Sequence, residues 1–415
     1  MTIPPQDYLR TLNSIRDRCY QVYEQATKGG LDYFDVDESK LPAVVEHVTA
    51  LAQRRFPDMD AIPPHSRLRH FDHVYQTWRE KTAKAGDKIE LARKLVDLVI
   101  VSVLVDAGAG PNWKYKTDSD KLVGRSEGLA LASVDMFLSG SFSSTSVLDQ
   151  VDAEGLANVS PETMAQGFQV TESNPMVGLE GRSTLLNRLG QTLKSESKYF
   201  PPSGSCPISR PGNLIDYILA NKQEDGNICI DTLWEAIMSL GSIWPARVEV
   251  NGVQLGDVWP CSCLGSNTPD NLVPFHKLSQ WLAYSLTEVI ETALDIQVQG
   301  ISKLTGLPEY RNGGLFIDYG VFVIKPEQIK RGGGNGSDIL PSFEGHDPLI
   351  VEWRALTVVY LDKVHKELEA KLGRKLKLAQ VLESGTWTAG REIAATLRPG
   401  DAGPPIIIKS DGTLF

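Results

Sequence analysis

The sequence predicts a mainly α protein, because its apolar residues recur at helical spacing along several long segments. Segment 275–294, FHKLSQWLAYSLTEVIETAL, gathers apolar residues on one helical face. Segment 87–107 starts with a capping aspartate and continues through a long apolar run. Asp347 precedes a proline, which predicts an N-cap and a helix over 348–372. Further helices are expected over 180–195, 211–222 and 231–243.

Strand signals are few and predict only a small β element. Asn251-Gly252 separates two alternating segments, which predicts a hairpin near 247–256. Short strands are expected near 315–324 and in the C-terminal segment PPIIIKSDGTLF. We therefore expect a multi-helix globular protein that carries a small β element.

Domain organisation is weakly marked, because no internal repeat, charge run or composition shift indicates a linker. We expect an N-terminal helical subdomain over 1–86 and a catalytic helical domain with the small β element over 87–415. A single domain is the alternative.

Composition limits the partners of the chain. Its 42 Lys and Arg against 52 Asp and Glu give a formal net charge of −10 over 415 residues. Nucleic acid is therefore not an expected partner, because phosphate binding needs a basic face. The N-terminus is polar, unlike a secretory signal, and the most apolar run, 95–105, is too short for a membrane span of about 20 residues. We expect a cytoplasmic protein that acts on a small molecule, and the sequence does not predict its oligomeric state.

The cysteines do not form a disulfide pattern, because they are odd in number and scattered. Reduced thiols are the favoured interpretation. The motif Cys261-Ser262-Cys263, followed by His276, leaves a metal site as the alternative, but no second cluster at zinc spacing accompanies it. We expect no metal and no organic cofactor. The five cysteines are Cys19, Cys206, Cys229, Cys261 and Cys263.

Several reaction classes lack their motifs in this chain. The phosphate loop GxxxxGK[ST] and the dinucleotide motif GxGxxG do not occur. A phosphoribosyltransferase usually shows paired acids after a strand, whereas Asp106 stands alone.

The segment LPEYRNGG places Glu309, Tyr310 and Arg311 between a proline and a glycine pair, with apolar residues on both sides. Burying charged groups costs free energy unless they are paired, so this turn is either part of an ion-pair network or a functional site. Asp106 poses the same choice in the last turn of helix 87–107, where the helix dipole disfavours a negative charge. Its alternative role is a structural carboxylate that accepts backbone amides.

Two further charges are expected on apolar helix faces. Glu352 and Arg354 have mainly apolar neighbours three and four residues away, and they point in different directions. Their partners must therefore come from elsewhere in the chain, and the candidates are Glu309, Arg311 and Asp106. On helix 275–294, a polar stripe that includes Lys277 and Gln280 is either a solvated face or part of a site.

The whole chain resembles the uracil-catabolism protein four family of fungi and bacteria. The matching segments are VDAGAGPNWKY, RSEGLALASVDMF, NPMVGLEGRSTLL, LTGLPEYRNGG, EWRALTVV, GTWTAGREIA and SDGTLF.

Four short blocks in the same order also resemble the queuosine-phosphate N-glycosylases, which suggests a similar helical fold. The blocks are an apolar run into VDA with a following Trp, an F-x-K-x-x-Q helix start, an acid-Tyr-Arg turn and E-x-R-A on a helix. Those glycosylases carry Asp at the position of Glu309, so the carboxylate here is one methylene further from the backbone.

Together the two resemblances imply a reaction. The uracil-catabolism family is placed on a route that makes uridine monophosphate and opens the pyrimidine ring, which leaves ribosylurea or its 5′-phosphate. The glycosylase resemblance implies hydrolysis of the C1′–N bond with release of urea. A uracil phosphoribosyltransferase-type enzyme, an amide hydrolase for a ureido intermediate and a non-catalytic partner of the ring-opening enzyme are the alternatives.

The resemblance also implies roles for the acids. Glu309 is expected nearest C1′ as general base or electrostatic stabiliser, and Asp106 is expected to hold the ribose hydroxyls or the urea group. Glu352 is a third catalytic candidate. With Arg311 and Arg354 it is also expected to hold the other acids in place.

Cations and aromatic rings are expected to bind the substrate. Lys277, at a helix start, is the expected phosphate ligand. Arg182, in a first helical turn, is a second phosphate candidate. The other expected substrate-binding residues are Trp113, Lys114, Tyr310 and Gln280.

Overall fold

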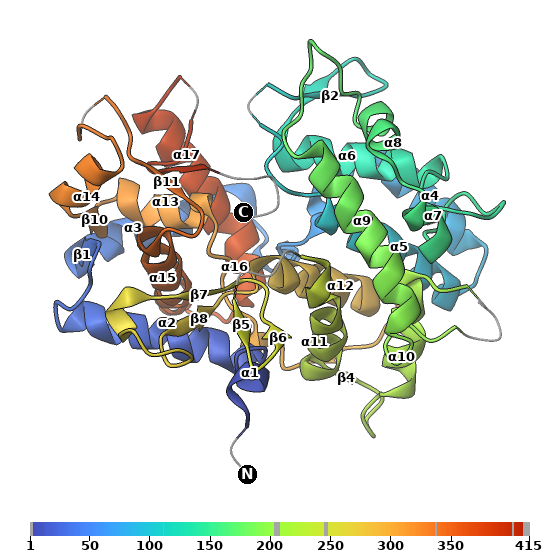
Figure 1. Cartoon of the computed structure of the whole chain (residues 1–415), viewed down its shortest axis with the longest axis horizontal. Helices are drawn as coiled ribbons and strands as arrows, with labels where there is room; N and C mark the ends of the chain where they lie inside the picture. Colours follow the sequence, from blue (N-terminus) through green and yellow to red (C-terminus); the bar gives the residue numbers. More distant parts are fainter. Residues whose placement is uncertain are drawn as a thin grey trace. The chain divides into compact units, whose positions relative to one another are not determined.

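The computed structural model describes residues 3–110, 112–202, 208–244, 248–336, 338–400 and 402–409. Helices dominate and the strands form short pairs, as Figure 1 shows, so the predicted mainly α fold is confirmed. Among the described residues, no helix is long and apolar enough to cross a membrane.

The chain divides into two compact units. Unit 1 comprises Met1–His65, Ala246–Gln280 and Ser302–Ser410, and unit 2 comprises Ser66–Pro245 and Trp281–Ile301.

Unit 1 contains the N-terminal helices and two later segments of the chain, Ala246–Gln280 and Ser302–Ser410. Its strands pair as β1–β10, β5–β6 and β7–β8, all antiparallel, and as β11–β12, which is parallel. Its helices are α1 Pro5–Tyr8, α2 Leu12–Thr27, α3 Leu41–Arg55, the start of α12 Lys277–Leu294, α13 Tyr310–Asp318, α14 Pro326–Arg331, α15 Pro348–Leu372, α16 Leu378–Val381 and α17 Trp387–Leu397. Its strands are β1 Phe34–Val36, β5 Glu249–Val250, β6 Val253–Gln254, β7 Val258–Pro260, β8 Leu272–Pro274, β10 Phe322–Ile324, β11 Ser342–Glu344 and β12 Ile407–Lys409.

Unit 2 is built from helices with two small strand pairs, β2–β3 and β4–β9. Its helices are α4 His73–Lys84, α5 Lys88–Leu104, α6 Arg125–Leu138, α7 Ala153–Ala157, α8 Pro161–Gly167, α9 Leu179–Ser195, α10 Leu214–Ala220, α11 Ile230–Ser239 and the remainder of α12. Its strands are β2 Tyr115–Lys116, β3 Leu122–Val123, β4 Ile228–Cys229 and β9 Val298–Gln299.

Local signals in the sequence account for the ends of the long helices. Asp87 caps α5 by accepting the backbone N–H groups of Ile89 and Glu90. Asp347 caps α15 by accepting the N–H of Leu349. The hairpin near 247–256 is confirmed as β5 and β6, because both residues of its Asn-Gly turn adopt positive φ.

The strand expected near 315–324 is wrong in its first half. Residues up to Asp318 belong to α13, and the strand begins at Phe322. Gly313 lies where α13 packs against α15, and a Cβ at this position would lie 2.7 Å from Nε1 of Trp353 on α15. Glycine thus allows α13 and α15 to approach closely, which offsets its low helix propensity. The expected C-terminal strand is confirmed for Ile407–Lys409, and the terminal SDGTLF lies outside the described residues.

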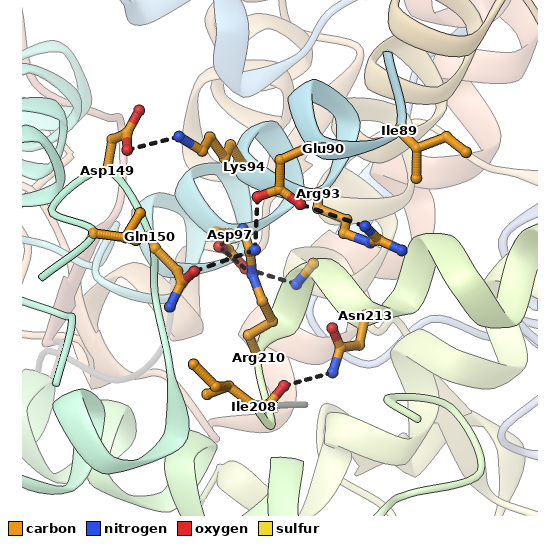
Figure 2. Close-up of polar contacts among 12 residues, drawn as sticks. Ile89, Glu90, Arg93, Lys94, Asp97, Asp149, Gln150, Ile208, Arg210 and Asn213 are labelled. Atoms are coloured by element: carbon orange, nitrogen blue, oxygen red, sulfur yellow. Dashed lines mark hydrogen bonds and ion pairs between the residues drawn. The ribbon is translucent and has the colours of Figure 1, made fainter. Parts of the chain in front are cut away.

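A buried charge network organises unit 2. Figure 2 shows Arg210 between Asp97 and Glu90, both of which belong to α5. Nε of Arg210 donates to Oδ2 of Asp97 at 2.9 Å, and its Nη1 donates to Glu90 at 2.8 Å. Asp97 also accepts the N–H groups of Val151 and Gly212. One fully buried carboxylate therefore connects α5 to the loop at Val151 and to the 3-10 turn Pro211–Asn213. The expected division of the chain after residue 86 stays a prediction.

Candidate functional site

Glu309 occupies the N-cap of α13, and both of its carboxylate oxygens are bound. Oε2 accepts the backbone N–H of Arg311 at 2.7 Å, and Oε1 accepts that of Asn312 at 2.6 Å. Burial raises the pKa of this carboxyl, against the opposing effect of the two amides, Lys277 and Arg311. A carboxyl with a raised pKa can exchange a proton closer to neutral pH. The Glu309 turn is therefore a helix cap whose carboxyl also has a raised pKa.

Lys277 begins α12, directly after β8 and two connecting residues. Its backbone N–H donates to Oδ2 of Asp257 at 3.0 Å. The carbonyl of Asp257 accepts the N–H groups of Phe275 at 2.9 Å and His276 at 3.3 Å. Asp257 therefore fixes the start of α12, and it places the Lys277 ammonium where its charge lowers the pKa of Glu309.

Arg354, on α15, connects this helix start to the Glu309 turn. Its Nη1 and Nη2 each lie 2.8 Å from an oxygen of Asp257, which makes a two-point ion pair. Its Nε donates to the carbonyl of Pro308 at 3.4 Å, one residue before Glu309. Although burial favours the neutral acid, Arg354 holds the pKa of Asp257 well below its ordinary value. The Asp257–Arg354 pair thus brings the starts of α12 and α13 together.

Gln280 fixes the loop that leads to Glu309. It is completely buried, and both ends of its amide bind Thr305. Nε2 donates to the Thr305 hydroxyl at 2.6 Å, and Oε1 accepts the Thr305 N–H at 3.0 Å. These contacts favour a positioning role, and the expected contact between Gln280 and substrate stays a prediction.

The two residues that follow Glu309 lie in different environments. Arg311 is buried, and its Nη1 donates to the carbonyl of Ala402 at 2.6 Å. Its guanidinium lies 5.0 Å from the centre of the Tyr310 ring. Arg311 therefore anchors the C-terminal segment, while the half-buried Tyr310 stays a candidate for substrate contact.

The partners of Glu352 and Arg354 differ from those expected. Glu352 accepts the backbone N–H groups of Asp32 at 3.0 Å, Tyr33 at 2.9 Å and Phe34 at 3.0 Å. Burial raises the pKa of Glu352 to about 7, although these amides favour the charged form. Glu352 thus anchors the segment before β1 to α15. Its catalytic role stays a prediction that these contacts do not support, and the ion pair of Arg354 is with Asp257.

Unit 2 contains a second acid paired with a cation. Asp106 lies just beyond the last residue of α5, not in its last turn as expected. Its Oδ2 is 3.0 Å from Nη1 of Arg67, and the hydroxyl of Ser126 donates to it at 2.8 Å. Arg67 is 0% exposed and Asp106 is 8% exposed. A buried pair with an added hydroxyl donor holds the carboxylate in one orientation, so Asp106 stays a candidate ligand for a polar substrate group.

Arg182 binds two backbone carbonyls just beyond α5 and one just before α9. Its three nitrogens donate to Val105 at 2.9 Å, Ala107 at 2.6 Å and Val177 at 2.5 Å. Burial lowers its pKa to about 10. These contacts favour a structural cap for α5, and the phosphate role expected for Arg182 stays a prediction.

Trp113 and Lys114 also belong to unit 2. Trp113 is 0% exposed, packs against Phe168 and donates its indole N–H to the Phe168 carbonyl at 2.8 Å. Lys114 is exposed, and its backbone binds the amide of Asn174. Trp113 is thus a packing residue in this conformation, and substrate contact by either residue stays a prediction.

The predicted site residues form two groups. In unit 1, the charge of Lys277 lowers the pKa of Glu309, and in unit 2, the charge of Asp106 opposes the lowering of the Arg182 pKa. The first group is Lys277, Gln280, Glu309, Tyr310, Arg311, Glu352 and Arg354, and the second is Asp106, Trp113, Lys114 and Arg182.

Sequence reasoning missed Asp257, Arg67 and Ser126. A weak signal was available for Asp257, since an acid stands directly before the apolar strand VWP. Arg67 lies in the polar segment HSRLRH, where nothing local indicates burial. In the parts of the chain that the structure describes, no group of three or more His, Cys, Asp or Glu residues is placed to hold a metal ion.

The buried Glu309 carboxyl and the Lys277 charge that acts on it lie in a helical protein whose family the sequence comparisons identify. A family model described as "Protein of unknown function (DUF1688)" matches residues 8–415, and the chain belongs to this family. It is 41% identical over 419 residues to "Protein urg3" of Schizosaccharomyces pombe, covering 98% of each chain. It is 39% identical over 439 residues to "Uracil catabolism protein 4" of Lachancea kluyveri, covering 99% of each. The resemblance to the uracil-catabolism protein four family is confirmed.

Proposed function

We propose that this protein acts in uracil catabolism as an N-glycosyl hydrolase that releases urea from ribosylurea or its 5′-phosphate. The name of the L. kluyveri relative and its similarity over nearly the full length support the pathway. The observation that carries the reaction is the Glu309 carboxyl, which is pinned by two backbone amides, has a raised pKa and lies in the field of Lys277.

The chemistry of the C1′–N bond suits such a carboxyl. As the bond to nitrogen breaks, positive charge develops on C1′ and O4′ of the ribose. A carboxylate held in one orientation stabilises this charge without reorganising, and it accepts a proton from the attacking water. Water oxygen bonds to C1′ as the C1′–N bond breaks, and a proton equivalent to the one that Glu309 takes from the water ends on the urea nitrogen. Amides that hold both oxygens of Glu309 leave each oxygen with acceptor capacity for that water.

Lys277 supports the phosphorylated substrate. Its ammonium group lies at the first residue of α12, where the helix dipole favours anions. Because Asp257 already accepts the backbone N–H of Lys277, the phosphate site rests mainly on the side chain. Lysine binds phosphate as a point charge, so affinity falls as salt concentration rises.

Asp106 is a second candidate within the same function. Arg67 and Ser126 hold its buried carboxylate in one orientation, and a carboxylate held in this way accepts hydrogen bonds from ribose hydroxyls or from urea nitrogen. We assign the reacting centre to Glu309, and the substrate-binding role expected for Asp106 stays a prediction.

Urea release by the purified chain is the direct test. The protein is incubated with ribosylurea and, separately, with its 5′-phosphate, and urea and the sugar product are measured. We expect urea and ribose, or urea and ribose 5-phosphate, in equal amounts. No release from either substrate overturns the proposal. Consumption of phosphoribosyl pyrophosphate with uracil would favour the transferase alternative, and release that appears only when the ring-opening enzyme is added would favour a non-catalytic partner.

A further inference from the structure

Cys261 and Cys263 form a close thiol pair that the proposed reaction does not use. Their sulfur atoms lie 3.5 Å apart, at the point where β7 ends and the 3-10 turn Ser262–Leu264 begins. Cys261 is fully buried and Cys263 is half-buried. A disulfide bond joins sulfurs at about 2.05 Å, so an approach of about 1.5 Å would close this pair.

We propose that Cys261 and Cys263 are a redox modification site, which closes into an intramolecular disulfide when a low-molecular-weight disulfide oxidises it. A metal is the less suitable occupant, because the described residues offer no third His, Cys, Asp or Glu beside the two thiols.

The environment of the pair sets the order of the chemistry. The hydrogen bond to Cys263, followed by burial, raises the pKa of the Cys261 thiol well above its usual range. Cys261 is therefore the poorer nucleophile, and Cys263 is the more exposed thiol, so an oxidant in solution meets Cys263 first.

Oxidation of the pair takes place in two thiol–disulfide exchange steps. The Cys263 thiolate attacks one sulfur of the oxidant, the oxidant S–S bond breaks, and one low-molecular-weight thiol leaves with a proton. Cys261 then loses its proton and attacks the Cys263 sulfur, which releases the second thiol. The two cysteines lose two electrons in total, and the oxidant gains them as it becomes two thiols.

Closure would act on a segment that positions the candidate site. The loop from Cys261 joins β7 to β8, and the N–H of Cys261 donates to the carbonyl of Asn271 at 2.9 Å. Asp257 precedes β7 directly, and Lys277 follows β8. Strain introduced between the two sulfurs therefore reaches the residues that hold the start of α12.

The test oxidises the full-length protein with glutathione disulfide, blocks remaining thiols by alkylation, and maps protease fragments by mass spectrometry. We expect the fragment with residues 261–263 to carry no alkyl group and no glutathione, and to regain two alkylation sites after reduction with dithiothreitol. Two alkyl groups on this fragment after oxidation, at every glutathione disulfide concentration, would overturn the proposal.

Single variants test the order of the steps. C261S removes the resolving thiol, so a stable glutathione adduct should accumulate on Cys263. C263S removes the attacking thiol, so Cys261 should stay reduced, with at least a tenfold lower yield of oxidised fragment. C229S, which changes a thiol bound to Asp231, is the matched control and should leave the disulfide yield unchanged. Equal oxidation of Cys261 in C263S and in the unchanged protein would contradict the pair.

Discussion

Asp257 and Arg354, which are 97 positions apart in the chain, form a two-point ion pair with both nitrogen–oxygen distances at 2.8 Å. Through this pair, the residue before β7 holds the start of α12 and the carbonyl before Glu309 at the same time. The placement of Lys277 relative to Glu309 therefore depends on a residue that takes no part in the proposed reaction.

Replacing Asp257 should separate positioning from chemistry. In D257N, Arg354 loses its charged partner, and we expect KM for the phosphorylated substrate to rise about tenfold because Lys277 is misplaced. The free energy of unfolding should fall by ~3 kcal/mol, the usual order for breaking a buried ion pair. D270N, an exposed aspartate in the same β7–β8 segment, is the control. Identical steady-state kinetics in D257N and D270N would contradict the positioning role.

Glu309 should carry most of the catalytic effect. We expect E309Q to lower kcat for urea release by about 100-fold, because an amide neither takes a proton nor stabilises positive charge as well. Since burial raises the pKa of Glu309, the rate should also fall on the acid side at a pH above the ordinary glutamate range.

Two further variants control for loss of the helix cap. E309D keeps a capping carboxylate, so it should retain the stability of α13 while it retracts the charge by one methylene. E327Q changes an exposed glutamate in the first turn of α14 and should leave kcat unchanged. If E309Q stays within about threefold of the unchanged protein, less than ~1 kcal/mol of the barrier is involved and the catalytic role is wrong.

Lys277 should distinguish the two substrates. We expect K277A to raise KM at least tenfold for the 5′-phosphate and by less than about twofold for ribosylurea, because only the phosphate pairs with the ammonium. K330A, at an exposed position of α14, provides the comparison. Equal losses on both substrates would assign Lys277 to the reacting centre or to structure.

The Asp97–Arg210 pair should be a stability element of unit 2. R210M leaves a fully buried carboxylate without its cation, so we expect the free energy of unfolding to fall by ~3–5 kcal/mol. The double variant D97N/R210M removes the uncompensated charge and should recover part of this loss. Urea unfolding followed by circular dichroism measures both, and a double variant less stable than R210M would contradict the explanation.

Glu352 should make stability depend on pH in a predictable direction. Its pKa is raised from 4.5 to about 7 in the folded protein, so the folded state binds the proton more tightly than the unfolded chain. The stabilising contribution is complete below about pH 4.5 and is lost as pH rises through about 7, by at most ~3 kcal/mol.

The variant E352Q cannot titrate, so it isolates this contribution. The stability of the unchanged protein relative to E352Q should fall between pH 5 and pH 7.5, when both are unfolded in urea. E367Q, on an exposed position of α15, should track the unchanged protein at both pH values. A difference that is constant with pH would mean that Glu352 does not titrate in this range.

Partners across long distances in the chain were the least predictable part of the site. Glu352 was expected to meet another side chain, but it binds the backbone amides of 32–34. Asp257 gave only a weak signal, because its two-point pairing with Arg354 exists only after β7 and α15 pack together. Helical spacing identifies which face of a helix is apolar, but it does not identify what covers that face.

The sequence by itself determined the features that arise from neighbouring residues. Capping aspartates set the starts of α5 and α15, the Asn-Gly turn set the β5–β6 hairpin, and the family resemblance marked Glu309. Tertiary structure alone decided that the glycine pair after Glu309 continues a helix, since the packing of Gly313 against Trp353 has no local signature. Tertiary structure also decided the raised pKa of the Glu309 carboxyl, because the burial that raises it depends on atoms that come from distant parts of the chain.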